Sequence, residues 1–529
     1  MERSGPIPFP PARGVAAWAS LALIGVIGAY VLMLLLAIAC AAGPIWLYGQ
    51  FQAQELSYEG IQGLTKVCGV TFLLCLSAGG VGTAILLLWS LVPVRSSFHP
   101  PGPLLHYREH PRLFAEVQSV ARAFGMMVPE ELYLASDVRV GVAEVESVLG
   151  LRGRRVIIVG LLALQVLTVA QFRAMTANGF AHFYTGDTIL YPWMFQVGSV
   201  MSRVFARISA RPGNPLLAII SAYGGLLRKG IAAALSAYWS MFRKLTQPVI
   251  IRLERRADEL TCLVAGTPAF SGGLRQMYRY GSLSRLFWQL EVAPIVGAGF
   301  LPPIAEGFGR FIKTSRADKA SIEALDAEMN RIEMNVLDMR IPLQYRIAAA
   351  PMHVAAAGPD DTALAISLIG QIEQIDRNLI ASVAPDIDAK ALKTVSWDRI
   401  VETVFIPAWS RTVKDHSKLL AGMTPQSIPA LLRQITTGGS LLPDPPGMLL
   451  TPAQRIERFR AFLRFALSLT LRREGWELSV ISGSIRLEKS GTTLDPTEIL
   501  ADLETGKMTA GSWLEQCRNL DIANIPLID

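Results

Sequence analysis

The residues whose types and spacing could hold a metal ion lie in one predicted helix, residues 167–187. Side chains four positions apart share a helix face, and the zinc motif His-Glu-x-x-His uses this spacing. Its two histidines bind the ion, and its Glu polarises the attacking water. Here the five corresponding residues are Asn178, Gly179, Phe180, Ala181 and His182. The stretch therefore keeps the second imidazole and lacks both the first imidazole and the carboxylate.

A second predicted helix, residues 249–260, carries a pair of acidic residues. It follows Pro248 and carries Glu254 and Asp258 four positions apart, on one face.

His106, Glu109 and His110 match the inverted zinc motif His-x-x-Glu-His and form a competing candidate metal site. However, Pro111 biases the residue before it away from helical geometry. Proline is also favoured at the first position of a helix, so we predict a helix over residues 111–124 with the histidines ahead of it. This spacing therefore favours a capping segment over a metal site.

The elements around these residues follow from periodicity and turn residues. We predict strands at residues 131–135, 138–146 and 155–160 before the helix that carries His182, and semi-apolar helices at 216–227 and 230–242 after it. Residues 272–429 are mostly helical in this pattern, with an amphipathic segment at 318–339. The last part is predicted as a helix at 452–471, a hairpin of strands 476–481 and 485–489, and two short helices that start near Asp495 and Thr509 and are separated by Gly506.

Two long charge-free gaps lie near the N-terminus, in a chain of 529 residues with 18% charged and 51% hydrophobic residues. They predict a transmembrane helical hairpin at about residues 15–47 and 67–94, because about 20 apolar residues suffice to span a bilayer. Arginines flank the hairpin and acidic residues lie between its spans, which predicts an integral inner- or plasma-membrane protein with both termini and the main domain in the cytoplasm.

Charge and cysteine content restrict the partners and the compartment. The net charge of +7 fits contact with an anionic membrane surface. Basic residues do not form a stripe interleaved with aromatic ones, so we expect no nucleic-acid partner. The five cysteines form no disulfide framework and no Cys-x-x-Cys pair, in agreement with a reducing compartment.

Two segments carry a family resemblance. Residues 174–188, AMTANGFAHFYTGDT, are similar to the segment AVLAHELGHFYGGDT of the membrane zinc metallopeptidases related to HtpX and the type I CAAX prenyl protease. Residues 254–258, ERRAD, resemble the Glu-x-x-Ala-Asp segment of the same family. The order of the predicted elements agrees as well, and the resemblance covers about residues 100 to 270.

The resemblance implies a role for each matching position. His182 corresponds to the second zinc histidine and Glu254 to the third ligand, while Asn178 and Gly179 replace the first histidine and the general base. Asp187 and Asp258 correspond to residues around the ligands. The cofactor that the resemblance implies is zinc, although Asn is a poor zinc ligand and Gly cannot take a proton. The same residues also allow a structural role, with His182 as a hydrogen-bonded core residue and Glu254 paired with a nearby arginine.

These observations predict an α+β, mainly α fold. Its parts are a membrane hairpin (1–97), a zincin-like peptidase core (98–275), a helical extension (276–445) and a C-terminal region with a helix, a β-hairpin and two short helices (446–529).

The favoured function is that of a membrane-anchored HtpX-like homologue without catalytic activity. It would bind or regulate peptide or membrane-protein clients. One alternative is an active zinc endopeptidase with an atypical metal site at Asn178, His182 and Glu254. A further alternative places the function in the C-terminal hairpin and helices, as an interaction module.

Overall fold

The computed structural model describes most of the chain from residue 98 onward. The described ranges are 98–129, 131–145, 154–184, 225–331, 341–355, 360–436, 450–481 and 484–528, with single positions and a few short runs elsewhere. The statements below concern these residues.

A four-stranded sheet lies at the start of the main body, with strand order β1-β2-β4-β3. Its strands are β1 (Leu104–Leu105), β2 (Glu131–Ala135), β3 (Val140–Val145) and β4 (Arg154–Gly160). β2 and β4 run parallel, with Leu134 opposite Val159, and β3 pairs antiparallel with β4, with Val142 opposite Ile157. The three predicted strands are thereby confirmed, and β3 is an outer strand of this sheet.

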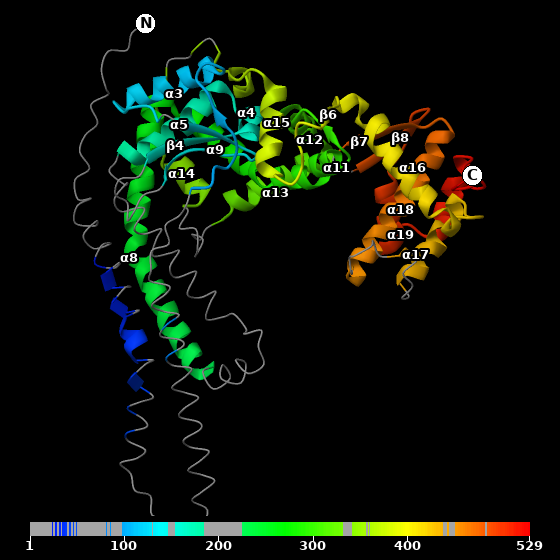
Figure 1. Ribbon diagram of the computed structural model, residues 1–529, viewed down its shortest axis with the longest axis horizontal. Coiled ribbons are helices and arrows are strands. Elements are labelled where there is room, and N and C mark those ends of the chain that lie inside the picture. Colours follow the sequence, from blue (N-terminus) through cyan, green and yellow to red (C-terminus); the bar gives the residue numbers. More distant parts are fainter. Residues whose placement is uncertain are drawn as a thin grey trace, which may run out of the picture.

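Helices pack around this sheet and bring distant segments together (Figure 1). α3 (Pro111–Ala123) starts at Pro111 as predicted, and α4 (Leu161–Val166) leads from β4 into α5 (Val169–Tyr184). His110 precedes α3, is buried, and accepts a hydrogen bond from the Gly370 N–H at Nδ1, 3.4 Å away. α5 contacts α3, β3, α8 and α9. The helix that the sequence singled out is therefore central to the packing of this part.

α8 (Gly225–Ala265) is one helix of 41 residues that extends well beyond the sheet (Figure 1). The sequence predicted two helices here, at 230–242 and 249–260, because proline inside a helix costs about 3 kcal/mol. That separation is wrong: Pro248 lies inside the helix, and the packing of α5 and α9 against α8 outweighs the cost. The predicted helix at 216–227 lies mostly outside the described residues.

The middle of the chain is helical, as expected. Its elements are α9 (Thr267–Gly281), α10 (Leu283–Phe287), η1 (Trp288–Val292), α11 (Ala293–Gly297), α12 (Ile304–Phe311), α13 (Ser315–Met329), α14 (Leu343–Ala349), η2 (Ala365–Leu368), α15 (Ile372–Val383), η3 (Trp397–Arg399) and η4 (Val401–Phe405). Short strands β5 (Phe300–Leu301) and β6 (Lys393–Thr394) pair in parallel. α13 covers the first part of the predicted amphipathic segment, and residues 332–339 of that segment lie outside the described part.

A buried carboxylate joins two of these helices. Asp376 on α15 is 2% exposed, and its Oδ2 accepts a hydrogen bond of 3.2 Å from the Ile304 N–H, the first residue of α12. The first N–H groups of a helix lack partners within the helix, so Asp376 acts as a cap from a neighbouring element.

The C-terminal unit follows local signals closely. It contains α16 (Ile406–Asp415), α17 (Ile428–Thr436), α18 (Pro452–Arg473), β7 (Glu477–Ile481), β8 (Ser484–Lys489), β9 (Thr492–Leu494), α19 (Pro496–Thr505) and α20 (Ala510–Asn519). Asp495 and Thr509 cap α19 and α20 as predicted, and Gly506 ends α19 with φ of 75°. β9 extends the predicted hairpin to three strands.

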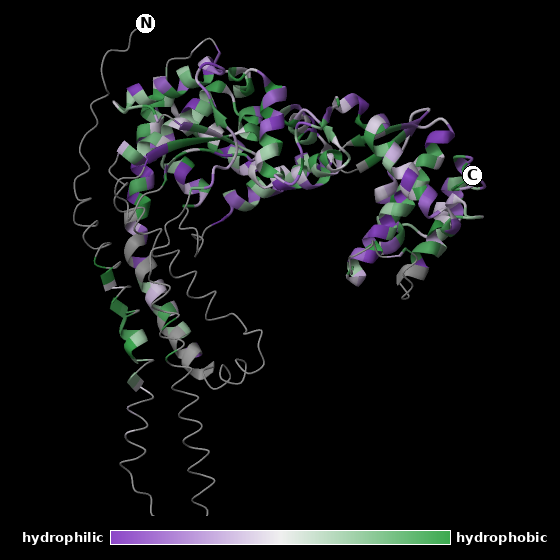
Figure 2. Cartoon of the chain, viewed as in Figure 1, coloured by the Kyte–Doolittle hydropathy of each residue, from purple (hydrophilic) through white to green (hydrophobic). Residues whose placement is uncertain are grey.

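Two large hydrophobic clusters hold the described part together. One runs from Leu105 to Leu392 and the other from Trp409 to Leu527, at opposite ends of the molecule in Figure 1. Hydrophilic and hydrophobic residues alternate around the C-terminal helices in Figure 2, as expected for helices packed on one side only. The predicted domain boundary at residue 275 falls within the first cluster, and the one at residue 445 falls within the second.

The predicted membrane segment requires correction. Within the described ranges, the structure has no helix that combines the length and the apolar character needed to cross a membrane. This finding overturns the transmembrane hairpin and the integral-membrane localisation, on which the cytoplasmic placement of the main domain was based. Most of residues 15–47 and 67–94 lie outside the described residues. α8 has the length, but charged residues such as Lys229, Lys244 and Arg252 recur along it.

Candidate functional site

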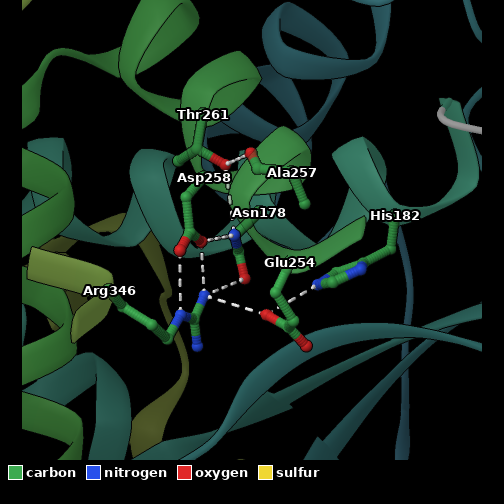
Figure 3. A network of polar contacts seen from close by, with 7 residues as sticks. All are labelled: Asn178, His182, Glu254, Ala257, Asp258, Thr261 and Arg346. Atoms are coloured by element: carbon green, nitrogen blue, oxygen red, sulfur yellow. Dashed lines mark hydrogen bonds and ion pairs between the residues drawn. The ribbon is translucent and has the colours of Figure 1, made fainter. Parts of the chain in front are cut away.

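Local capping fixes where α5 begins and therefore which residues share its faces. The Thr168 hydroxyl accepts a hydrogen bond from the Gln171 N–H at 3.3 Å, and the Gln171 side chain accepts one from the Thr168 N–H at 3.0 Å. This reciprocal pair is a capping box. Ten residues further along, α5 presents Asn178 and, one turn later, His182 toward α8 (Figure 3).

The predicted site residues do come together, from α5 and α8. His182 Nε2 lies 3.8 Å from Glu254 Oε2. Asn178 Nδ2 donates to Asp258 Oδ1 at 3.1 Å and to the Thr261 hydroxyl at 3.2 Å. Figure 3 shows these side chains facing one another between the two helices. The i, i+4 spacing in each helix thus places its two residues on the face that meets the other helix.

A residue that the sequence did not indicate completes the cluster. Arg346, on the short helix α14, donates from Nε to Asp258 Oδ2 at 3.0 Å and from Nη2 to Asp258 Oδ1 at 2.5 Å. The same Nη2 lies 3.4 Å from Asn178 Oδ1 and 3.4 Å from Glu254 Oε2. The guanidinium also lies 5.8 Å from the centre of the Phe270 ring. One cation therefore binds three of the four predicted residues of this cluster.

Burial sets the electrostatics of this cluster. The side chains of Arg346 and Asp258 are 12% and 4% exposed. Burial raises the pKa of Asp258, and the nearby Arg346 partly offsets that shift. Burial also lowers the pKa of Arg346, but the charges of Asp258 and Glu254 outweigh it, so the pKa ends above its ordinary value. Arg346 is therefore a permanent cation here.

Gly179, which the resemblance aligns with the general base of the zinc motif, lies directly against strand β3. A Cβ atom on Gly179 would lie 2.9 Å from Val142 N and 3.0 Å from Val142 Cγ2. Contacts this short require the strand to move. The structure thus leaves no room here for a carboxylate side chain unless β3 shifts.

The donor set does not fit a zinc ion. Zinc sites use three or four imidazole, thiolate or carboxylate ligands. No group of three His, Cys, Asp or Glu residues that could hold a metal ion occurs in the part of the chain that the structure describes. His182 and Glu254 form a pair, the third position is the amide of Asn178, and the guanidinium of Arg346 lies within 3.4 Å of two of the atoms that would face the ion. A second cation at this point would be repelled.

The remaining predicted residues are placed as follows. Asp187 lies outside the described residues. Asp258 lies beside the site, as the resemblance implied, and binds Arg346 and Asn178.

Thr261 was missed, although it shares one face of α8 with Glu254 and Asp258, a signal that the spacing offered. Its hydroxyl donates to the Ala257 carbonyl at 2.7 Å, which leaves its oxygen free to accept from Asn178. Arg346 had no comparable signal, since its segment contains no motif.

No known protein family matches the chain, and comparisons with curated proteins and with solved structures find no similar protein.

Proposed function

We propose that this chain is a peptidase-like protein without hydrolytic activity, which binds or regulates peptide clients on a scaffold like that of the HtpX-related metallopeptidases. The observation that carries the proposal is the contact between Gly179 and strand β3. A hydrolase of this type needs a base beside the metal-bound water, and loss of such a base costs about 10² to 10⁴ in rate. The close approach of Val142 to Gly179 removes the space for one.

The outer strand β3 suggests how a client would bind. Strand β4 occupies one edge of β3, and β3 stands last in the strand order of this sheet among the described residues. All six residues of β3 are half-buried. An extended peptide can add to such an edge through main-chain hydrogen bonds, and this mode requires no catalytic group.

The proposal is tested with unfolded casein and fluorescently labelled casein peptides as probes. We expect saturable binding by fluorescence anisotropy, no cleavage above background, and no effect of a chelator. Chelator-sensitive cleavage that is lost in His182→Ala would contradict the proposal and establish an atypical zinc endopeptidase, the second candidate, which the 3.8 Å separation of His182 and Glu254 favours. Absence of both binding and cleavage would contradict the peptide-binding function.

The contact at Gly179 gives a separate prediction. In an open helix, Gly→Ala stabilises by up to about 1 kcal/mol. Gly179→Ala is expected to destabilise by roughly 1 to 2 kcal/mol instead, because overpacking against a backbone costs about 1 to 3 kcal/mol. The measurement is the free energy of unfolding in urea.

The matched control is Gly511→Ala in α20, where an added Cβ would meet only the Thr509 hydroxyl oxygen, at 3.9 Å. We expect this control to be neutral or stabilising. Equal stabilisation by the two substitutions would show that β3 does not press on Gly179.

A further inference from the structure

The side chains around Arg346 suit a guanidinium better than a zinc ion. The Arg346 guanidinium contacts oxygens of Asp258, Glu254 and Asn178 at distances of up to 3.4 Å. Oxygen acceptors in several directions suit the rigid fork of a guanidinium, whereas zinc prefers nitrogen or sulfur ligands with few carboxylates.

We propose that Arg346 replaces a metal ion in this cluster, and that residues 178, 182 and 254 form a latent zinc site which Asn178 and Arg346 together keep closed. The inference rests on the proposed function, a peptidase-like protein without hydrolytic activity, and concerns the same residues. It requires that removal of the guanidinium and introduction of one imidazole suffice to create zinc binding.

The spacing of the surviving side chains supports this inference. Two ligands of one tetrahedral zinc ion, each about 2.0 to 2.1 Å from it, lie about 3.3 Å apart. His182 Nε2 and Glu254 Oε2 are 3.8 Å apart, so a small adjustment brings both to ligand distance. Asn178 lies on the same face of α5 as His182, one turn earlier, so an imidazole there would have the i, i+4 geometry of a zinc helix.

Asp258 supplies the outer partner that such an imidazole needs. Metal-bound histidines usually donate their second N–H to a carboxylate, which fixes the ring. Asn178 already donates to Asp258 Oδ1 at 3.1 Å. In the native chain Arg346 holds the same carboxylate with two nitrogens, so both substitutions are needed to give Asp258 this new role.

The test compares zinc binding by the full chain and its variants, measured by competition with a chromogenic chelator and by the visible absorption of bound Co²⁺. Asn178→His with Arg346→Met is expected to bind one Zn²⁺ per chain. Each single variant and the native chain are expected to bind it at least about 100-fold more weakly, since even loss of a residue behind the ligands costs about 10 to 100-fold. Adding Glu254→Gln to the double variant should abolish binding, and adding Asp258→Asn should weaken it about 10 to 100-fold.

Three results would overturn the inference. These are stoichiometric zinc binding by the native chain, equally tight binding by Asn178→His alone, and no binding by a folded double variant. Circular dichroism shows whether each variant is folded. If Arg346→Met unfolds the chain, Arg346→Gln replaces it, because the amide of Gln can still donate a hydrogen bond to Asp258. These outcomes concern metal affinity only, so failure here is distinct from failure of the peptide-binding and cleavage tests.

Discussion

Replacement of Arg346 by Met is expected to lower the free energy of unfolding by about 3 to 5 kcal/mol, the usual cost of removing one partner from a buried ion pair. The substitution removes the partner of Asp258, which is 4% exposed, and a contact of Glu254, which is 17% exposed. The side-chain oxygen of Asn178 also loses the hydrogen bond that it accepts from Arg346. Urea unfolding followed by circular dichroism measures the effect.

Arg112→Met is the matched control, because Arg112 also pairs with an aspartate, Asp360, at 2.9 Å, but both side chains are more than half exposed. An exposed pair contributes about 0 to 1 kcal/mol, so the control should change little. Salt should also weaken the effect of Arg112 more than that of Arg346, because exposed charges are screened. Similar losses for the two variants would mean that the Arg346 cluster is not the buried centre described above.

The second large effect is a pH dependence from Asp376. The pKa of Asp376 is raised to about 7, mainly by burial and to a smaller extent by the nearby charge of Glu373, while the hydrogen bond from the Ile304 N–H acts to lower it. Its Oδ1 atom is buried and has no hydrogen-bond partner among the described residues. The folded state therefore holds a proton on Asp376 more tightly than the unfolded chain, whose Asp pKa is near 3.9.

The sign follows from linkage. A group whose pKa is raised on folding contributes stability that is fully present below the unfolded pKa and is lost as the pH rises through the folded pKa. Three pKa units correspond to roughly 4 kcal/mol, so this amount should disappear between about pH 4 and pH 8. Asp376→Asn should remove the dependence and make the variant more stable than the native chain at pH 8.

Urea unfolding at pH 4 and pH 8 measures this difference in the free energy of unfolding. Asp386→Asn, at an exposed position beyond α15, is the control and should keep the native pH dependence. If Asp376→Asn keeps it as well, Asp376 does not carry the proton.

Short-range signals predicted the strands β2 to β4, the helix α3 and several elements of the C-terminal unit, while the middle of the chain was predicted only as mostly helical. β2 was predicted at its observed residues, α3 begins at Pro111, and α20 begins after the Thr509 cap. These signals depend on residues a few positions apart. The i, i+4 pairs that placed Asn178 and His182 on α5, and Glu254 and Asp258 on α8, are of the same kind.

Predictions failed where the decisive contact was distant in sequence. Arg346 lies 168 positions from Asn178 and 88 from Asp258. A local sequence pattern cannot predict a partner so far away. Pro248 was taken as a boundary because its local cost is known, while the packing that outweighs this cost is tertiary. The transmembrane prediction counted uncharged residues, which measures composition and not an apolar helix of sufficient length.

The cation that pairs with Asp258 and Glu254 is a side chain of the protein itself, Arg346. Its presence beside these carboxylates is therefore controlled differently from that of a bound metal ion. A bound metal ion stabilises a protein by an amount that depends on its free concentration, and dilution or a chelator removes it. Arg346 is tethered, so its concentration at Asp258 and Glu254 is set by the intervening chain and does not depend on supply. The pairing of α14 with α5 and α8 therefore persists under metal starvation, which would empty an ordinary zinc site.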